Sequence, residues 1–143
     1  MEILQAGFET AVRSRFGLDE DDLPNEEINQ PLIVDVAEAL IKRRVPRYTE
    51  ITDDIEFLFL QNAVISQICA ILCPSMPRRL DLKVAVSDVK IEKEKVDWIK
   101  QQEIYLQEVE SNLSQITSVE VLTSAGTPIV GLIRNERKPI GRG

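Results

Sequence analysis

The residues of this 143-residue chain that could do chemistry are two cysteines and two groups of carboxylates, and the chain contains no histidine. Carboxylate pairs can serve as general acid and base, and a thiol can serve as a nucleophile or a metal ligand. Without histidine, the commonest general base and the ordinary pH switch are both missing. The sequence therefore favours a protein that is not an enzyme.

The two thiols belong to Cys69 and Cys73, which stand four residues apart within an apolar run. This spacing places both on one helical face, where a disulfide would be geometrically awkward. A metal site would need two further ligands, and the neighbouring sequence offers none. We expect two small buried side chains in a reducing compartment, with no metal and no cofactor.

The carboxylates lie in two short stretches, the DEDD run at 19–22 and the pair Asp53-Asp54. The DEDD run lacks the glycine and the final glutamate of a calcium-binding EF-hand loop. Acidic residues are also favoured at helix starts by the helix dipole alone. We interpret the pair as part of a helix cap and the run as a solvated loop, which leaves an acid-base or metal enzyme as the weakest alternative.

The composition is that of one soluble, folded domain without a nucleic-acid footprint. Lys and Arg number 17 against 24 Asp and Glu, so the net charge is −7, and 43% of the residues are hydrophobic. Duplex binding depends on a basic surface that this balance does not supply. The first 16 residues lack the pattern of a secretory signal. The apolar stretch 55–73 contains Glu56, Gln61, Asn62 and Gln67 and is therefore too polar for a membrane span. We expect a cytoplasmic protein without a membrane.

Apolar periodicity predicts a mainly α fold, a small helical bundle. The first helix is expected over residues 2–16, ended by Gly17, and the second begins at a cap on Asn29 or Gln30, with Pro31 in its first turn. The third runs over 53–72, with Asp53 and Glu56 as a capping pair, and Cys73-Pro74 ends it. The fourth covers 96–116, with one apolar face that includes Ile99, Leu106, Val109, Leu113 and Ile116.

The third helix is apolar around its whole circumference. A helix of this kind must be enclosed on all sides, and a chain with so few other helices can hardly enclose it alone. Burial by neighbouring subunits is the simplest expectation. The residues on which this rests are Phe57, Leu58, Phe59, Leu60, Val64, Ile65, Ile68, Ile71 and Leu72.

Two stretches predict extended structure. Residues 82–91 alternate between apolar and polar side chains, with a phase shift near Ser87-Asp88, and indicate a strand-like β segment within a helical domain over 1–117. Residues 118–143 contain a turn at Ala125-Gly126, the apolar run 129–133 and a basic tail. They predict a C-terminal β-hairpin or arm that docks to a partner.

Basic and aromatic residues, together with the apolar run of the C-terminal segment, are the candidates for partner contacts. Arginine suits an acidic interface because its guanidinium group binds carboxylates in a fork, although solvated helix ends and loops are the more common reason for basic clusters. Aromatic residues seven apart on the fourth helix share a face, either as a contact patch or, more commonly, as core. The candidates are Arg43, Arg44, Arg47, Arg78, Arg79, Trp98, Tyr105, Ile129, Val130, Leu132, Ile133, Arg134, Arg137 and Lys138.

The order of these features resembles the head-tail connector proteins of tailed bacteriophages, the adaptor or head-completion subunits of the neck. The likeness covers residues 16–116 and rests on FGLDEDDLP, PLIVDVAEALIKRRVP, FLFLQNAVISQICAILCPSMPRRL and KEKVDWIKQQEIYLQEVESNLSQI, taken in that order. Its most distinctive pieces are the apolar helix that ends in CPSMPRRL and the KVDW helix start.

This resemblance implies a structural virion protein that assembles in the host cytoplasm. It implies a homo-oligomeric ring of about twelve copies under the portal protein, which extends the DNA channel and carries the next neck or tail component. DNA would pass through the lumen without sequence-specific binding, and the C-terminal segment would reach the portal. The alternative is a small cytoplasmic helical module that regulates or binds a cellular partner.

Overall fold

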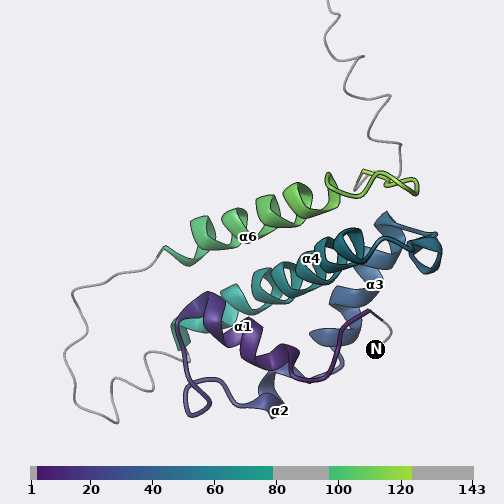
Figure 1. Ribbon diagram of the computed structural model, residues 1–143. Helices are drawn as coiled ribbons and strands as arrows, with labels where there is room; N and C mark the ends of the chain where they lie inside the picture. Colours follow the sequence, from purple (N-terminus) through teal and green to yellow (C-terminus); the bar gives the residue numbers. More distant parts are fainter. Residues whose placement is uncertain (1–2, 79–96, 124–143) are drawn as a thin grey trace, which may run out of the picture.

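The computed structural model describes residues 3–78 and 97–123, and these form a mainly helical bundle (Figure 1). The mainly α prediction is confirmed. The described ranges contain no β-strand, while segment 82–91 and most of 118–143 lie outside them. In chain order the elements are α1 (Phe8–Phe16), α2 (Asn25–Ile28), α3 (Val34–Arg44), the 3-10 turn η1 (Tyr48–Glu50), α4 (Asp54–Leu72), the 3-10 turn η2 (Cys73–Ser75) and α6 (Trp98–Leu113).

Helix α4 is the centre of the bundle, and α1, α3 and α6 pack against it. Helices α4 and α6 lie side by side and run in opposite directions (Figure 1). Their pairing is fixed at both ends, because Gln102 donates to the Ala70 carbonyl at 2.8 Å and Thr117 donates to the Glu56 carboxylate. One end of the bundle therefore holds the start of α4, and the other holds its last turns together with the start of α6.

The helix ends follow local rules that the sequence carries. Asp53 caps α4 by accepting from the Ile55 amide at 3.1 Å, and Asp97 caps α6 by accepting from the Lys100 amide at 3.2 Å. Gly17 ends α1 at a φ of 70°, a left-handed conformation that glycine adopts without steric cost. The predicted stop at Gly17 and the cap at Asp53 are both confirmed.

The first two predicted helices begin later than expected. Helix α1 starts at Phe8 and not near residue 2, because Gly7 has a φ of 90° and the amides of Ile3 and Leu4 donate to the buried Glu38 carboxylate. Helix α3 starts at Val34, after a turn in which the amides of residues 33 and 34 donate to the Gln30 carbonyl. A short helix, α2, lies between these two helices, where the sequence pattern predicts no helix.

The other two helices also differ in detail. Glu56 was expected to cap α4, but its carboxylate accepts hydrogen bonds from Thr117 and Ser118 instead. Helix α6 is shorter than the predicted 96–116. The predicted apolar face of α6 is wrong at Ile99 and Leu106, which are exposed, and right at Val109, Leu113 and Ile116.

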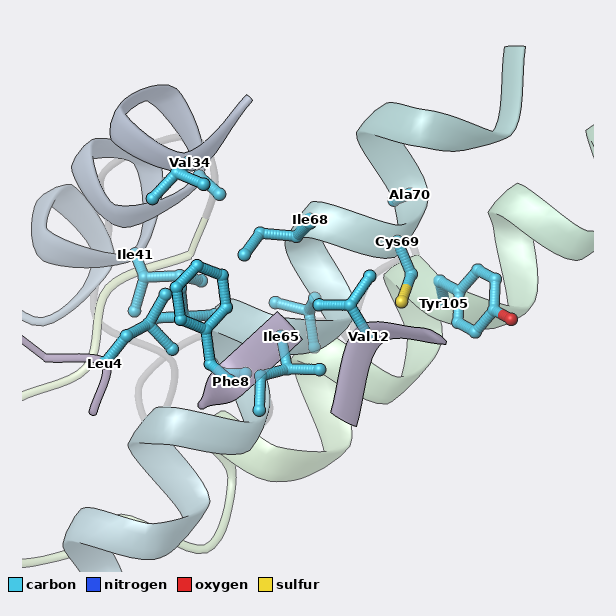
Figure 2. Packing of buried hydrophobic residues seen from close by; sticks show 14 of the residues in the cluster. Leu4, Phe8, Val12, Val34, Ile41, Ile65, Ile68, Cys69, Ala70 and Tyr105 are labelled. Carbon is cyan, nitrogen blue, oxygen red and sulfur yellow. The ribbon is translucent and has the colours of Figure 1, made fainter. Parts of the chain in front are cut away.

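The core forms around the second half of α4. Figure 2 shows side chains from the N-terminal segment, α1 and α3 gathered around those of α4. The labelled members include Leu4, Phe8, Val12, Val34, Ile41, Ile65 and Ile68. This single chain buries most of α4 from Leu60 onwards, contrary to the expectation that so few helices could not enclose it. Only its first turns keep large apolar side chains exposed.

One described helical stretch, Asp54–Arg78, which comprises α4 and the turns after it, is long and apolar enough to cross a membrane. Of its apolar part, 61% is buried inside the bundle, as is usual for the core helix of a soluble fold. Length and composition alone are therefore weak support for a membrane span.

Candidate interaction surfaces

Arg44 is a buried candidate arginine whose guanidinium group is hydrogen-bonded to groups far away in the chain. Its guanidinium group forms a fork with the Glu110 carboxylate at 2.8 and 2.7 Å and also donates to the Leu122 carbonyl. The Leu122 amide in turn donates to the Arg44 carbonyl at 2.7 Å. The structure therefore places Arg44 in a buried connection between α3, α6 and the following segment, where its charge is already matched inside the chain.

Arg43, Arg47 and Arg78 are exposed. Arg47 faces Glu50 at 3.9 Å, and both side chains are well solvated. Arg43 and Arg47 lie just before α4 in the chain, and Arg78 follows its last turn. Since α4 has 19 residues, these two basic groups are separated by about 28 Å of helix. They occupy opposite ends of the bundle.

Tyr105 is buried in the core, and Trp98 is half-buried against it. The Phe16 ring lies 6.0 Å from the Trp98 ring and 5.4 Å from the Tyr105 ring, the latter edge-on. The buried Tyr105 hydroxyl donates to the Arg15 carbonyl at 2.9 Å. Burial raises the pKa of Tyr105 to about 12. These contacts join the end of α1 to the start of α6.

A polar network that the sequence did not reveal crosses the interface of α1, α4 and α6. Arg15 donates to Glu108 at 2.6 Å and to the Ser66 hydroxyl at 3.1 Å, while Ser66 donates to the same Glu108 oxygen at 3.1 Å. The three residues are far apart in the chain, so no local pattern could have predicted the network. Ser66 is fully buried, and its hydroxyl is paired within this network.

The Glu56 carboxylate is a second contact that the sequence did not reveal. It accepts from the hydroxyl of Ser118 at 2.6 Å and from the amide and hydroxyl of Thr117 at 3.1 and 3.0 Å. The Ser118 hydroxyl and then the Thr117 amide are the main groups that hold the pKa of Glu56 below its usual value of 4.5. Together with Arg44, Glu56 attaches residues 117–122 to the bundle.

Both cysteines are free and buried, as predicted. Burial raises the pKa of Cys69 to about 12 and that of Cys73 to about 11, so neither thiol forms a thiolate near neutral pH. Within residues 3–78 and 97–123, no three potential metal-ligating side chains of Cys, Asp or Glu come together.

Exposed large apolar side chains of the described residues lie on α4, on α6 and around the start of α3, where Leu32 and Val36 are exposed. On α4, Ile55 and Leu58 are 62% and 57% exposed, and the exposed acids Glu50, Asp53 and Asp54 precede them. On α6, Ile99 is 75% exposed and Leu106 lies two turns further along the helix. Arg79 and the C-terminal candidates Ile129, Val130, Leu132, Ile133, Arg134, Arg137 and Lys138 lie outside the described residues.

The chain matches no protein-family model, no curated protein and no solved structure.

Proposed function

We propose that the protein is a structural virion protein, a head-to-tail connector adaptor that assembles as a ring under the portal vertex. In this role it extends the DNA channel and carries the next neck or tail component. The proposal rests on the order of sequence features that resembles the tailed-phage connectors and on a bundle whose two ends differ. It assigns the protein no catalytic reaction.

The observation that carries the proposal is the position of the two long segments relative to the bundle. Residues 79–96 follow Arg78, at the end where α4 finishes. Residues 124–143 follow the segment that Glu56 and Arg44 hold at the other end, where α4 begins. A bundle with a long segment at each end suits an adaptor that meets different partners above and below, here the portal and the next neck protein.

The charge pattern supports the same role. The net charge of −7 disfavours binding to phosphate, as suits a protein beside passing DNA. The exposed basic groups at opposite ends of the bundle, with Arg43 and Arg47 at one and Arg78 at the other, suit contacts with acidic protein surfaces. The exposed apolar side chains at the start of α4 suit contacts between neighbouring copies.

The first experiment is mass spectrometry of purified phage particles from the source of this chain, with copy number scaled to the portal subunit. A copy number equal to that of the portal supports a neck ring. Absence from the particles overturns the adaptor function.

A small cytoplasmic binding module is the second candidate. The observation that favours it is the burial of α4 from Leu60 onwards by this chain alone, which a monomer can maintain without a ring. Light scattering separates the two functions. A module that acts as a monomer keeps one mass over a wide range of concentration, and an adaptor forms larger species.

A further inference from the structure

The start of α4 carries a surface in which apolar and acidic side chains adjoin. We define the acceptor patch as Glu50, Asp53, Asp54, Ile55 and Leu58, all of which are exposed. Ile55 and Leu58 lie one turn apart and therefore share a side of the helix. The three acids precede them in the chain and surround the helix start. A ligand for this patch should combine an apolar stretch with positive charge.

The chain itself contains a segment of that description. Residues 129–133 supply four large apolar side chains, and three cations follow within the next five residues. The donor segment, residues 129–138, thus carries Ile129, Val130, Leu132 and Ile133, followed by Arg134, Arg137 and Lys138. Its apolar run matches Ile55 and Leu58, and its cations match the acids. Complementary charge of this kind sets the partner and orientation of a contact.

We infer that the donor segment of one copy binds the acceptor patch of a neighbouring copy. This inference rests on the proposed ring assembly and names the contact between its subunits. Among the other exposed apolar side chains, Ile99 and Leu106 of α6 flank Lys100 and Glu103, whose opposite charges offer a basic segment no such match. Leu32 and Val36, around the start of α3, are exposed as well.

The proposed ring favours a neighbouring copy over the same chain as the source of the donor segment. Glu56 holds residues 117 and 118, and a helix turns by about 100° per residue, so Ile55 and Leu58 project about 100° and 160° around α4 from Glu56. The patch therefore lies on a different side of α4 from the contact with residues 117 and 118. A contact between different surfaces of identical copies is head-to-tail, which is the type that closes rings.

The test uses the full chain and measures its mass by light scattering over a range of concentrations. We expect Leu58→Asp to raise the concentration at which half of the chains are assembled by at least about tenfold, and the combined reversal R134E/R137E/K138E to do the same. Ile99→Asp is the matched control, because it places the same charge at another exposed apolar residue of the bundle. It should leave assembly unchanged. Thermal melts of each variant show whether the fold is kept.

Charge rescue keeps the test independent of any folding defect at Leu58. The double change Glu50→Lys with Asp54→Lys should weaken assembly, and adding it to the reversed donor segment should restore assembly at least about tenfold. If Leu58→Asp and both charge reversals leave assembly at the level of the unaltered chain, the inference fails while the ring proposal stands. If the unaltered chain does not assemble at all, both fail.

Mixing distinguishes a neighbour from the same chain. A copy with Leu58→Asp still offers a donor segment, and a copy with the reversed donor segment still offers a patch, so the mixture should form one-to-one pairs that neither variant forms alone. If mixing yields no pairs although each variant is folded, the donor segment does not bind the patch of another copy, and the inference is overturned.

Discussion

The two ends of α4 have the same apolar character and opposite surroundings. Leu72, in the last turn, is 1% exposed, whereas Leu58, in the second turn, is 57% exposed. Helices α1 and α6 and the turn η2 surround the later turns, and the first turns have less cover. The apolar sequence of a helix therefore predicts that its side chains must be buried. Which of its turns are buried depends on where the other helices pack against it.

Shortening the same residue type at each end should produce the largest contrast. Leu72→Ala leaves a cavity in the core and should lower the free energy of unfolding by about 2–5 kcal/mol. Leu58→Ala removes exposed surface and should change it by less than about 0.5 kcal/mol. Urea unfolding of both variants measures the difference. Equal losses would contradict the division of α4 into an enclosed and an open end.

Two arginines that are close in the chain should also differ. Arg44→Ala removes the fork to Glu110 and the bond to Leu122, and we expect a loss of about 1.5–3 kcal/mol in the free energy of unfolding. Arg47→Ala removes a solvated pair with Glu50 and should cost less than about 0.5 kcal/mol. Arg44→Lys keeps the charge without the fork, so its loss of unfolding free energy should lie between those of the two alanine variants. An Arg44→Ala chain as stable as Arg47→Ala would show that the attachment of α3 to α6 is not stabilising.

We expect the stability of the exposed first turns of α4 to depend more on the N-terminal cap than on the burial of side chains. Asp53→Ala removes the acceptor for the Ile55 amide and should cost about 1 kcal/mol, whereas Asp53→Asn keeps an acceptor and should cost less. Chemical denaturation compares the three chains. If the alanine and asparagine variants were equally unstable, the loss would come from charge and not from the cap.

The smallest expected effect concerns Glu56 and depends on pH. Because its pKa is lower in the folded chain than the ordinary 4.5, ionised Glu56 stabilises the fold above that pH, and the contribution is lost as the pH falls through the folded pKa. Glu56→Gln should therefore melt below the unaltered chain at pH 7, by a margin that narrows in acid. Glu103→Gln, at an exposed position of α6, is the control. A margin independent of pH would contradict the ionised contact with Thr117 and Ser118.

Some features of the fold could be predicted because their causes are local. The cap at Asp53 and the stop at Gly17 depend on residues within one turn, and the apolar repeat of 53–72 depends on the helix period. The start of α1 was predicted too early. Gly7 has a left-handed conformation, and the amides of Ile3 and Leu4 bind the distant Glu38, so the helix begins only at Phe8.

Some candidate contact residues are buried in the structure and others are exposed, and no local sequence pattern predicts which. Arg43, Arg44 and Arg47 look alike in sequence, yet Arg44 alone meets Glu110, which is 66 residues further along the chain. Tyr105 was a candidate for contact or core, and the ring of Phe16 decided for the core. Ile99 and Leu106 fit the apolar repeat of α6, but the described helices leave both exposed.

The sequence by itself determined that the four longer helices form, where α4 starts and α1 stops, and that no histidine chemistry is possible. These properties follow from backbone propensity, capping groups and composition, which act over a few residues. Only the tertiary structure decided which arginine is buried, that Glu56 holds Thr117 and Ser118, and which end of α4 stays open. Those outcomes depend on contacts between residues far apart in the chain, and such contacts exist only once the helices have packed.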